Sequence, residues 1–231
     1  MPVGHTGGAH WWGTLVGHAS ACQYNMKITK SGIRRPIHIY KNDTYYFISS
    51  STFNKLPVIN TFEKKSYLKK FFFEKSQLFL VDMKAWVILD NHYHILFWLE
   101  EENNLSKFIG QVNGATARYF NKIDAGGARF SVPTGTINSA PPNSLRPLTT
   151  RNVWYRGKYW DRCIRSERDF WMRFNYIHNN PIKHGIIESI DKLDPYEFSS
   201  WNYYIKNCGE KWLLSVFEKY PVIDYTVEGI E

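Results

Sequence analysis

The sequence predicts an α+β fold in which a mostly antiparallel sheet is backed by helices. The segment TYYFISSSTF (44–53) is rich in β-branched and aromatic residues, as strands are. VDMKAWVILDNHYHILFWLE (81–100) holds two apolar runs joined by Asp90-Asn91. This pair favours a turn or bulge, so we expect a hairpin or a kinked pair of strands. Helical patterns lie between and after these strands, and such mixing over short connections is typical of the α+β class.

Two of the helical segments flank the expected hairpin. KLPVINTFEKKSYLKKFFFEKS (55–76) is helical in pattern over most of its length. NNLSKFIGQVNGATARYFNK (103–122) suits a helix capped by Asn103 or Asn104, because an asparagine side chain accepts a hydrogen bond from the first backbone N–H groups. We expect its apolar face to be buried, and this face consists of Leu105, Phe108, Ile109, Val112 and Phe120.

A third helix is predicted from residue 166 to residue 179 (SERDFWMRFNYIHN). Ser166 suits the N-cap, and Glu167 and Asp169 place negative charge in the first turn, where the helix dipole favours it. We expect Pro181 to end the helix, because proline lacks the backbone N–H that the next turn needs.

These elements belong to one predicted domain, residues 31–210. Residues 1–25 contain no Lys, Arg, Asp or Glu and are rich in Gly, Ala and His, so we expect a poorly ordered N-terminal extension over 1–30. The segment 125–150 is dense in Gly, Pro, Ser, Thr and Asn, and we interpret it as a flexible insertion. Residues 211–231 are assigned to a C-terminal tail.

The chain is basic, with 29 Lys and Arg against 21 Asp and Glu, a formal net charge of +8 and a pI near 9.3. This balance favours a polyanionic partner, nucleic acid first and an anionic membrane surface second. The alternative is a soluble protein that is merely basic.

Three widely spaced cysteines indicate the cellular compartment. Cys22, Cys163 and Cys208 form neither a disulfide framework nor the close pairs of a zinc site, so we expect a reducing cytoplasm. We find no run long enough to span a membrane and no secretory signal at the N-terminus.

The segment DNHYHILFWLE (90–100) interrupts an apolar run with two histidines. Residues two apart on a strand point to the same face, so His92 and His94 project together while Tyr93 faces the opposite side. Two neutral imidazoles side by side suit a divalent metal, with a third ligand from another element. The alternative is a pair of hydrogen-bonded histidines on a half-exposed strand, and the short motif alone does not decide.

A second motif lies in NYIHNNPIKHGI (175–186). Tyr176 and Asn180 are four residues apart and share a helix face. Alone, this pattern is more often a packing aromatic and a helix C-terminal asparagine. Together with the histidines it supplies a metal site, a third oxygen ligand and an oxygen nucleophile, which is the set needed for attack on a phosphodiester.

A histidine-hydrophobic-histidine strand followed by a Y-I-x-x-N-P helix resembles the HUH-type single-tyrosine transposases of the IS200-like superfamily. The REP-associated tyrosine transposases are the most similar branch, and TYYFISSSTFNK, LSKFIGQVNGATARYFNK, YRGKYWDRCIRSERDF and PYEFSSWNYY agree with it in order and spacing. The likeness covers residues 36–205, interrupted by 125–150. Two positions depart from the pattern: Tyr93 replaces an aliphatic residue, and Arg162 stands where the family often has a further histidine.

The resemblance implies a ferredoxin-like fold, that of the HUH endonucleases, with the histidine pair on a central strand. It implies that His92 and His94 hold a divalent metal, Mg²⁺ or Mn²⁺, with Asn180 as the third ligand. Tyr176 would be the nucleophile.

The implied activity is metal-dependent cleavage and transfer of single-stranded DNA through a covalent 5′-phosphotyrosine, on DNA that carries a hairpin. One alternative is a catalytically inactive hairpin-DNA-binding protein of the same fold. Another is a phosphodiesterase that uses water, with Tyr176 only structural. The expected location is a bacterial-type cytoplasm, in association with the nucleoid.

Basic residues on both sides of the insertion are candidates for contact with DNA phosphates, although a solvated surface charge is the alternative at each position. The REP-associated branch implies a monomer, whereas insertion-sequence relatives are dimers, so a dimer stays open. The candidate DNA-binding residues are Lys107, Arg118, Lys122, Arg156, Lys158, Arg162 and Arg165.

Overall fold

The computed structural model describes most of the predicted domain. Most of the predicted N-terminal extension and most of the predicted insertion lie outside the described residues, so the proposed domain boundaries stay predictions. Within the described part of the chain, no helix combines the length and the apolar character that crossing a bilayer requires. The described residues are 27–28, 34–35, 41–128, 153–155, 159–190 and 196–223.

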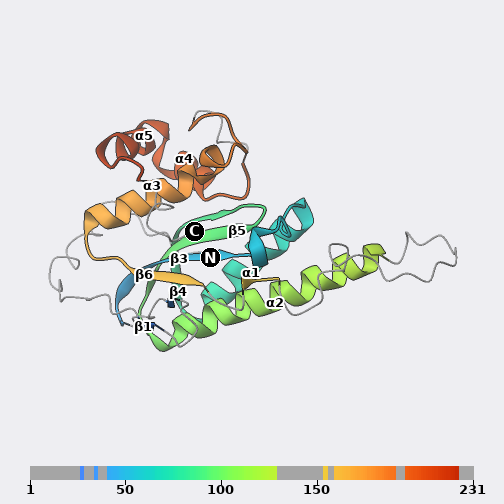
Figure 1. The fold of residues 1–231 in the computed structure, drawn as a ribbon. Helices are drawn as coiled ribbons and strands as arrows, with labels where there is room; N and C mark the ends of the chain where they lie inside the picture. Colours follow the sequence, from blue (N-terminus) through green and yellow to red (C-terminus); the bar gives the residue numbers. More distant parts are fainter. Residues whose placement is uncertain are drawn as a thin grey trace, which may run out of the picture.

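Four strands form an antiparallel sheet in the spatial order β4-β5-β3-β6. They are β3 (Thr44–Ser51), β4 (Val81–Ile88), β5 (His92–Leu99) and β6 (Trp160–Cys163). With the two helices between them, the chain runs β-α-β-β-α-β, which is the ferredoxin-like arrangement (Figure 1). The predicted fold class is confirmed, and β5 lies inside the sheet with a neighbour on each side.

A separate two-stranded ladder precedes the sheet. It pairs β1 (Lys27–Ile28) with β2 (Arg34–Arg35) in antiparallel register.

Helices α1 (Phe62–Leu78) and α2 (Asn103–Ala128) cover one face of the sheet, and α3 (Glu167–Lys183) covers the other (Figure 1). The predicted apolar face of α2 is fully buried in the core, and each such side chain contributes about 1.5–3 kcal/mol by leaving water. Helix α1 begins at residue 62 and so covers most of the segment 55–76 that was predicted to be largely helical. Pro57 disfavours helix in the residue before it, and the Thr61 side chain accepts a hydrogen bond from Lys64 N at the start of the helix.

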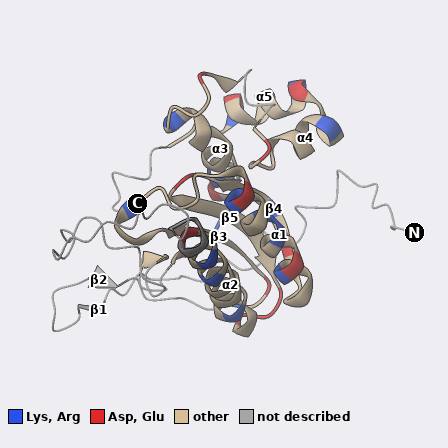
Figure 2. Ribbon diagram, turned by 90° about the vertical axis from the view of Figure 1, so that its right-hand side faces the viewer, with Lys and Arg blue, Asp and Glu red and all other residues tan. Residues whose placement is uncertain are grey.

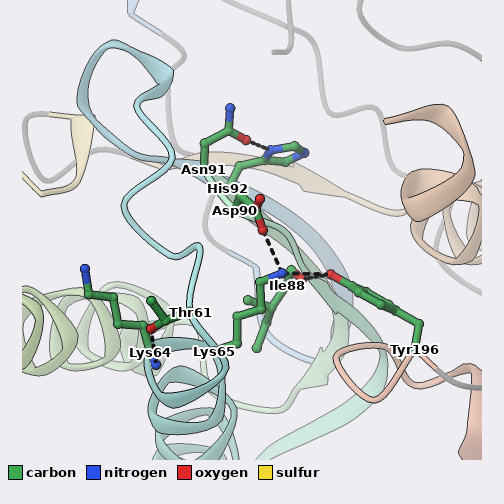
Figure 3. Close-up of polar contacts among 8 residues, drawn as sticks. All are labelled: Thr61, Lys64, Lys65, Ile88, Asp90, Asn91, His92 and Tyr196. Atoms are coloured by element: carbon green, nitrogen blue, oxygen red, sulfur yellow. Dashed lines mark hydrogen bonds and ion pairs between the residues drawn. The ribbon is translucent and has the colours of Figure 1, made fainter. Parts of the chain in front are cut away.

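The turn between β4 and β5 forms at Asp90-Asn91, as predicted. Leu89 N donates to His92 O at 2.8 Å and closes the hairpin. The Asp90 carboxylate lies 2.7 Å from Lys65 Nζ of α1, so an ion pair ties the turn to the helix layer (Figure 3).

Helix α3 agrees with the prediction at its start and differs at its end. The Ser166 side chain accepts a hydrogen bond from Asp169 N, which confirms the predicted N-cap. Pro181 does not end the helix: it lies inside the last turn, which continues to Lys183. A proline this close to a helix end removes only one backbone hydrogen bond, and here the ring is buried.

Helices α4 (Trp201–Cys208) and α5 (Glu210–Lys219) follow α3. Helix α5, apart from its first residue Glu210, falls within the residues that we assigned to a C-terminal tail, and its Leu213 and Val216 are buried. The Asn175 side chain of α3 donates to Val216 O at 3.0 Å and to Tyr220 O at 2.6 Å, so the end of α5 is bonded to α3.

Candidate active site

Strand β5 presents His92 and His94 to the α3 side of the sheet. Tyr93, between them, points the other way: its hydroxyl donates to Asn113 Oδ1 of α2 at 2.9 Å, and its ring packs edge-on against Phe72 of α1. The alternation predicted from the sequence is therefore present, and Tyr93 is fully buried on the face opposite the histidines.

Helix α3 brings Tyr176 and Asn180 against the histidine pair. The rings of His94 and Tyr176 are 5.2 Å apart between centroids, and Asn180 Oδ1 lies 3.4 Å from His92 Nε2. The Asn180 amide nitrogen donates to Tyr176 O at 2.9 Å, which fixes the orientation of the amide. Four predicted site residues from distant parts of the sequence thus meet at one place, with Tyr176 only 2% exposed.

Phe47 and Arg173 extend this site toward β3. The Phe47 ring stacks on His94 at 5.4 Å and lies 6.0 Å from the Tyr176 ring. The Arg173 guanidinium carbon lies 4.9 Å from the centre of the Phe47 ring, and its Nε is 3.4 Å from Asp169 Oδ1. Arg173 is completely buried, so a positive charge lies inside the site on the sheet-facing side of α3.

Two residues at the end of α3 join the site and were missed by the sequence prediction. Lys183 Nζ lies 5.3 Å from the centre of the Tyr176 ring. The ring of His184 lies 4.9 Å from the ring of His92. The signal was present, because His184 follows Asn180 by four residues and shares its helix face, but the prediction ended the helix before this turn.

The environment keeps both strand histidines neutral. Burial lowers the pKa of His92 to about 3, and the neighbouring His184 adds to the shift. Burial, followed by the nearby His92, also lowers the pKa of His94 well below its usual value. A neutral imidazole keeps a nitrogen lone pair for a metal, whereas an imidazolium does not.

The donor set at this place fits a divalent cation. Among the residues that the structure describes, no group of three or more His, Cys, Asp or Glu side chains is arranged to hold a metal ion. The candidate set therefore combines two neutral imidazoles with the amide oxygen of Asn180. Mn²⁺ accepts such a mixture of nitrogen and oxygen donors. Mg²⁺ prefers oxygen donors, so the two imidazoles suit it less well.

Comparison with known proteins supports the same family. Residues 41–129 match the family model described as "Transposase IS200 like". A REP-associated tyrosine transposase of Escherichia coli (strain K12) is 22% identical over 110 residues, which are 47% of this chain and 49% of that protein. The chain thus matches about half the length of this curated relative. The structure of a REP-associated tyrosine transposase bound to a REP hairpin matches with a TM-score of 0.56 at 18% identity, over 76% of this chain and 87% of that chain.

The resemblance to the IS200-like transposases is confirmed. The match to the family model runs from β3 through α2, so it includes His92 and His94 but neither Tyr176 nor Asn180. The structural match supports the fold of the chain. Tyr176 and Asn180 are therefore assigned to the candidate site by their contacts with His94 and His92.

The IS200-like segment also holds three of the predicted DNA-binding residues. Lys107, Arg118 and Lys122 are exposed on α2. Helix α2 lies on the opposite side of the sheet from α3, the helix that carries Tyr176 (Figure 2). Arg118 and Lys122 line a groove of about 530 Å³ between α1 and α2, together with Lys75. The structure therefore does not gather these residues around the site.

The remaining predicted DNA-binding residues flank β6. Arg162 is half-buried on the α3 side, with its Nε 3.5 Å from Asp169 Oδ2, and Arg165 is exposed. Arg156 and Lys158 lie outside the described residues.

Proposed function

We propose that this protein is a metal-dependent single-stranded DNA endonuclease and strand transferase that acts through a covalent 5′-phosphotyrosine at Tyr176. One observation carries the proposal: Tyr176 and Asn180 of α3 lie directly against His92 and His94 of β5. The similarity of residues 41–129 to IS200-like transposases supports the same chemistry.

Tyr176 would attack the scissile phosphorus through its phenol oxygen. A new bond forms between this oxygen and phosphorus, the bond from phosphorus to the 3′ oxygen breaks, and the phenol proton leaves while the 3′ oxygen gains one. His92, His94 and Asn180 would hold a divalent cation, Mg²⁺ or Mn²⁺, which supplies charge stabilisation at a non-bridging phosphate oxygen when bound. Later attack by a 3′ hydroxyl reverses the exchange, so the reaction needs no external energy source.

Positive charge next to the Tyr176 ring supports this role. Lys183 lies over the ring, and Arg173 lies behind Phe47 on the same face of α3. The Lys183 charge favours a phosphate at this place and the negative charge that develops on the phenol oxygen during attack. The Arg173 charge is partly compensated by Asp169.

The substrate that we propose is DNA with a hairpin and a flanking single strand. The exposed Lys107, Arg118 and Lys122 of α2 would contact backbone phosphates. Arg118 and Lys122, together with Lys75, line the groove between α1 and α2, which would hold part of the DNA backbone. Because α2 and Tyr176 lie on opposite sides of the sheet, we infer that the hairpin and the scissile strand contact different faces. Arg162 and Arg165 would contact phosphates of the scissile DNA strand near α3. We propose a monomer as the active unit.

A second candidate function is binding of hairpin DNA without cleavage. The burial of Tyr176 at 2% exposure favours it, because a nucleophile must reach its phosphate. Under the leading proposal, DNA binding is accompanied by a movement of Tyr176 or of the side chains that cover it.

The test is incubation with end-labelled hairpin-bearing single strands and Mn²⁺, followed by a denaturing gel. The proposal expects a covalent protein–DNA band that Tyr176→Phe abolishes and that Tyr203→Phe, at an exposed tyrosine of α4, leaves intact. Tight hairpin binding without a band supports the second candidate. Cleavage without a band that survives Tyr176→Phe indicates hydrolysis by water.

A further inference from the structure

Asn91, directly before the histidine pair, has both ends of its side chain engaged. Its amide nitrogen donates to Lys55 O at 3.0 Å. Its amide oxygen lies 2.6 Å from His92 Nδ1 (Figure 3). If the amide were turned around, its oxygen would face the Lys55 carbonyl oxygen, and two acceptors would repel each other. The Lys55 carbonyl therefore fixes which way Asn91 points.

The orientation of Asn91 determines the tautomer of His92. Its amide oxygen can only accept, so His92 Nδ1 carries the proton, and Nε2 keeps a lone pair. Nε2 faces Asn180 Oδ1 at 3.4 Å, and the amide of Asn180 is itself fixed by its bond to Tyr176 O. Two acceptors face each other at this distance, an arrangement that a cation between them would satisfy.

The Lys55 carbonyl, where this series of hydrogen bonds begins, lies in a strained turn. Asn54 and Lys55 both have a φ of 53°, in the left-handed region that residues with a Cβ rarely adopt. Residues on both sides of this turn bind the β4–β5 turn: Thr52 N donates to Asn91 O at 2.8 Å and Ile59 N donates to Asp90 O at 2.7 Å. Strain that the surroundings hold in place is common where a functional group must be positioned.

We propose that Asn91 is a positioning residue that holds the proton of His92 on Nδ1, and so turns the Nε2 lone pair toward Asn180, with the Lys55 carbonyl as its anchor. The inference rests on the proposed function, because it describes the metal side of the same site. A partner that fixes the far nitrogen of a metal-binding histidine typically changes metal affinity by about 10- to 100-fold.

The first test is ¹⁵N NMR of the metal-free protein, with His92 assigned by its loss in His92→Gln. Wild type is expected to carry the His92 proton on Nδ1. Asn91→Leu should lose this preference, whereas Asn91→Asp, which keeps an acceptor next to Nδ1 but loses the bond to the Lys55 carbonyl, should retain part of it. A wild-type His92 with its proton on Nε2, or an Asn91→Leu variant that keeps the Nδ1 proton, would overturn the proposal.

The second test is titration with Mn²⁺ alone, without DNA. Asn91→Leu should bind Mn²⁺ about 10- to 100-fold more weakly, and Asn91→Asp, which keeps the acceptor next to Nδ1 without the bond to Lys55 O, should recover part of the affinity. Asn207→Leu is the matched control, because it removes a similar bond from an asparagine side chain to a carbonyl, at Tyr203 O of α4, and should change neither readout. Equal Mn²⁺ affinity in wild type and Asn91→Leu would contradict the proposal.

Both tests are independent of DNA cleavage. If the tautomer and Mn²⁺ results are as expected but no covalent adduct forms, the positioning role stands and the proposed reaction fails. If the adduct forms but Asn91→Leu changes neither readout, the reaction stands and the positioning role fails.

Discussion

Lys183 Nζ lies 5.3 Å from the centre of the Tyr176 ring, two helical turns further along α3. The contact joins a cation to the residue that we propose as the nucleophile. It exists because the helix continues through Pro181, so that Lys183 returns to the face that carries Tyr176.

Replacing Lys183 by Met is expected to slow formation of the covalent adduct. We expect Lys183 to stabilise the charge that develops on the phenol oxygen by about 0.5–2 kcal/mol more than it stabilises the neutral ring, which corresponds to about a 2- to 30-fold change in rate. The measurement is the rate of adduct formation at saturating DNA. Lys183→Arg should retain most of the rate. Equal rates for Lys183→Met and wild type would exclude a role of Lys183 in adduct formation.

Mn²⁺ is expected to stabilise the folded protein, because a ligand that binds only the native state shifts the unfolding equilibrium. Asn180→Ala removes the amide oxygen next to His92 and should reduce the upward shift in Tm that Mn²⁺ produces. Asn180→Asp should restore the shift, since a carboxylate oxygen is a better ligand for Mn²⁺. Identical Mn²⁺-induced shifts in wild type and Asn180→Ala would exclude Asn180 as a ligand.

Neutralising the groove between α1 and α2 is expected to weaken hairpin binding. Lys75→Met and Arg118→Met should each reduce the slope of log K against log salt by about 1, because each lost phosphate contact releases one counterion fewer. Binding measured across a salt series checks this. Lys206→Met, an exposed lysine on α4, is the control and should keep the wild-type slope; unchanged slopes in the groove variants would place the DNA elsewhere.

Ser200 is expected to be important for stability rather than for chemistry. Its hydroxyl oxygen lies 2.7 Å from His178 Nε2 and accepts from Trp86 N at 3.0 Å, so it connects α3 to β4 in the buried interior. Ser200→Ala leaves buried polar groups without this partner and should lower the free energy of unfolding by about 1–3 kcal/mol.

Urea denaturation measures the effect of Ser200→Ala. Ser215→Ala, which removes an exposed hydroxyl that donates to Trp212 O, should change the free energy of unfolding by less than about 0.5 kcal/mol. A loss in Ser200→Ala no larger than in this control would show that the buried bond contributes nothing.

The parts of the fold that follow from local periodicity could be predicted from the sequence. The buried face of α2 and the alternation of His92, Tyr93 and His94 depend only on the repeat of a helix or a strand. The meeting of Tyr176 with His94 required a resemblance to a family, because no local pattern gives the packing of α3 on β5.

The rest of the site was missed for identifiable physical reasons. Proline usually ends a helix, so we predicted the end of α3 too early and missed Lys183 and His184 as neighbours of the site. The proposed role of Asn91 depends on a carbonyl at Lys55, whose left-handed backbone its residue type does not predict, although Asn54 before it is a residue type that adopts this conformation. The burial of Arg173 is likewise set by tertiary packing, since arginine is rarely fully buried.

The proposed covalent bond between Tyr176 and DNA is tested most directly by mass spectrometry. The peptides are obtained after wild-type protein has reacted with hairpin-bearing single strands and Mn²⁺. We expect a single modified peptide with a 5′-phosphonucleotide on Tyr176. A modification on Tyr93 or another residue, or cleaved DNA with no modified peptide, would contradict it.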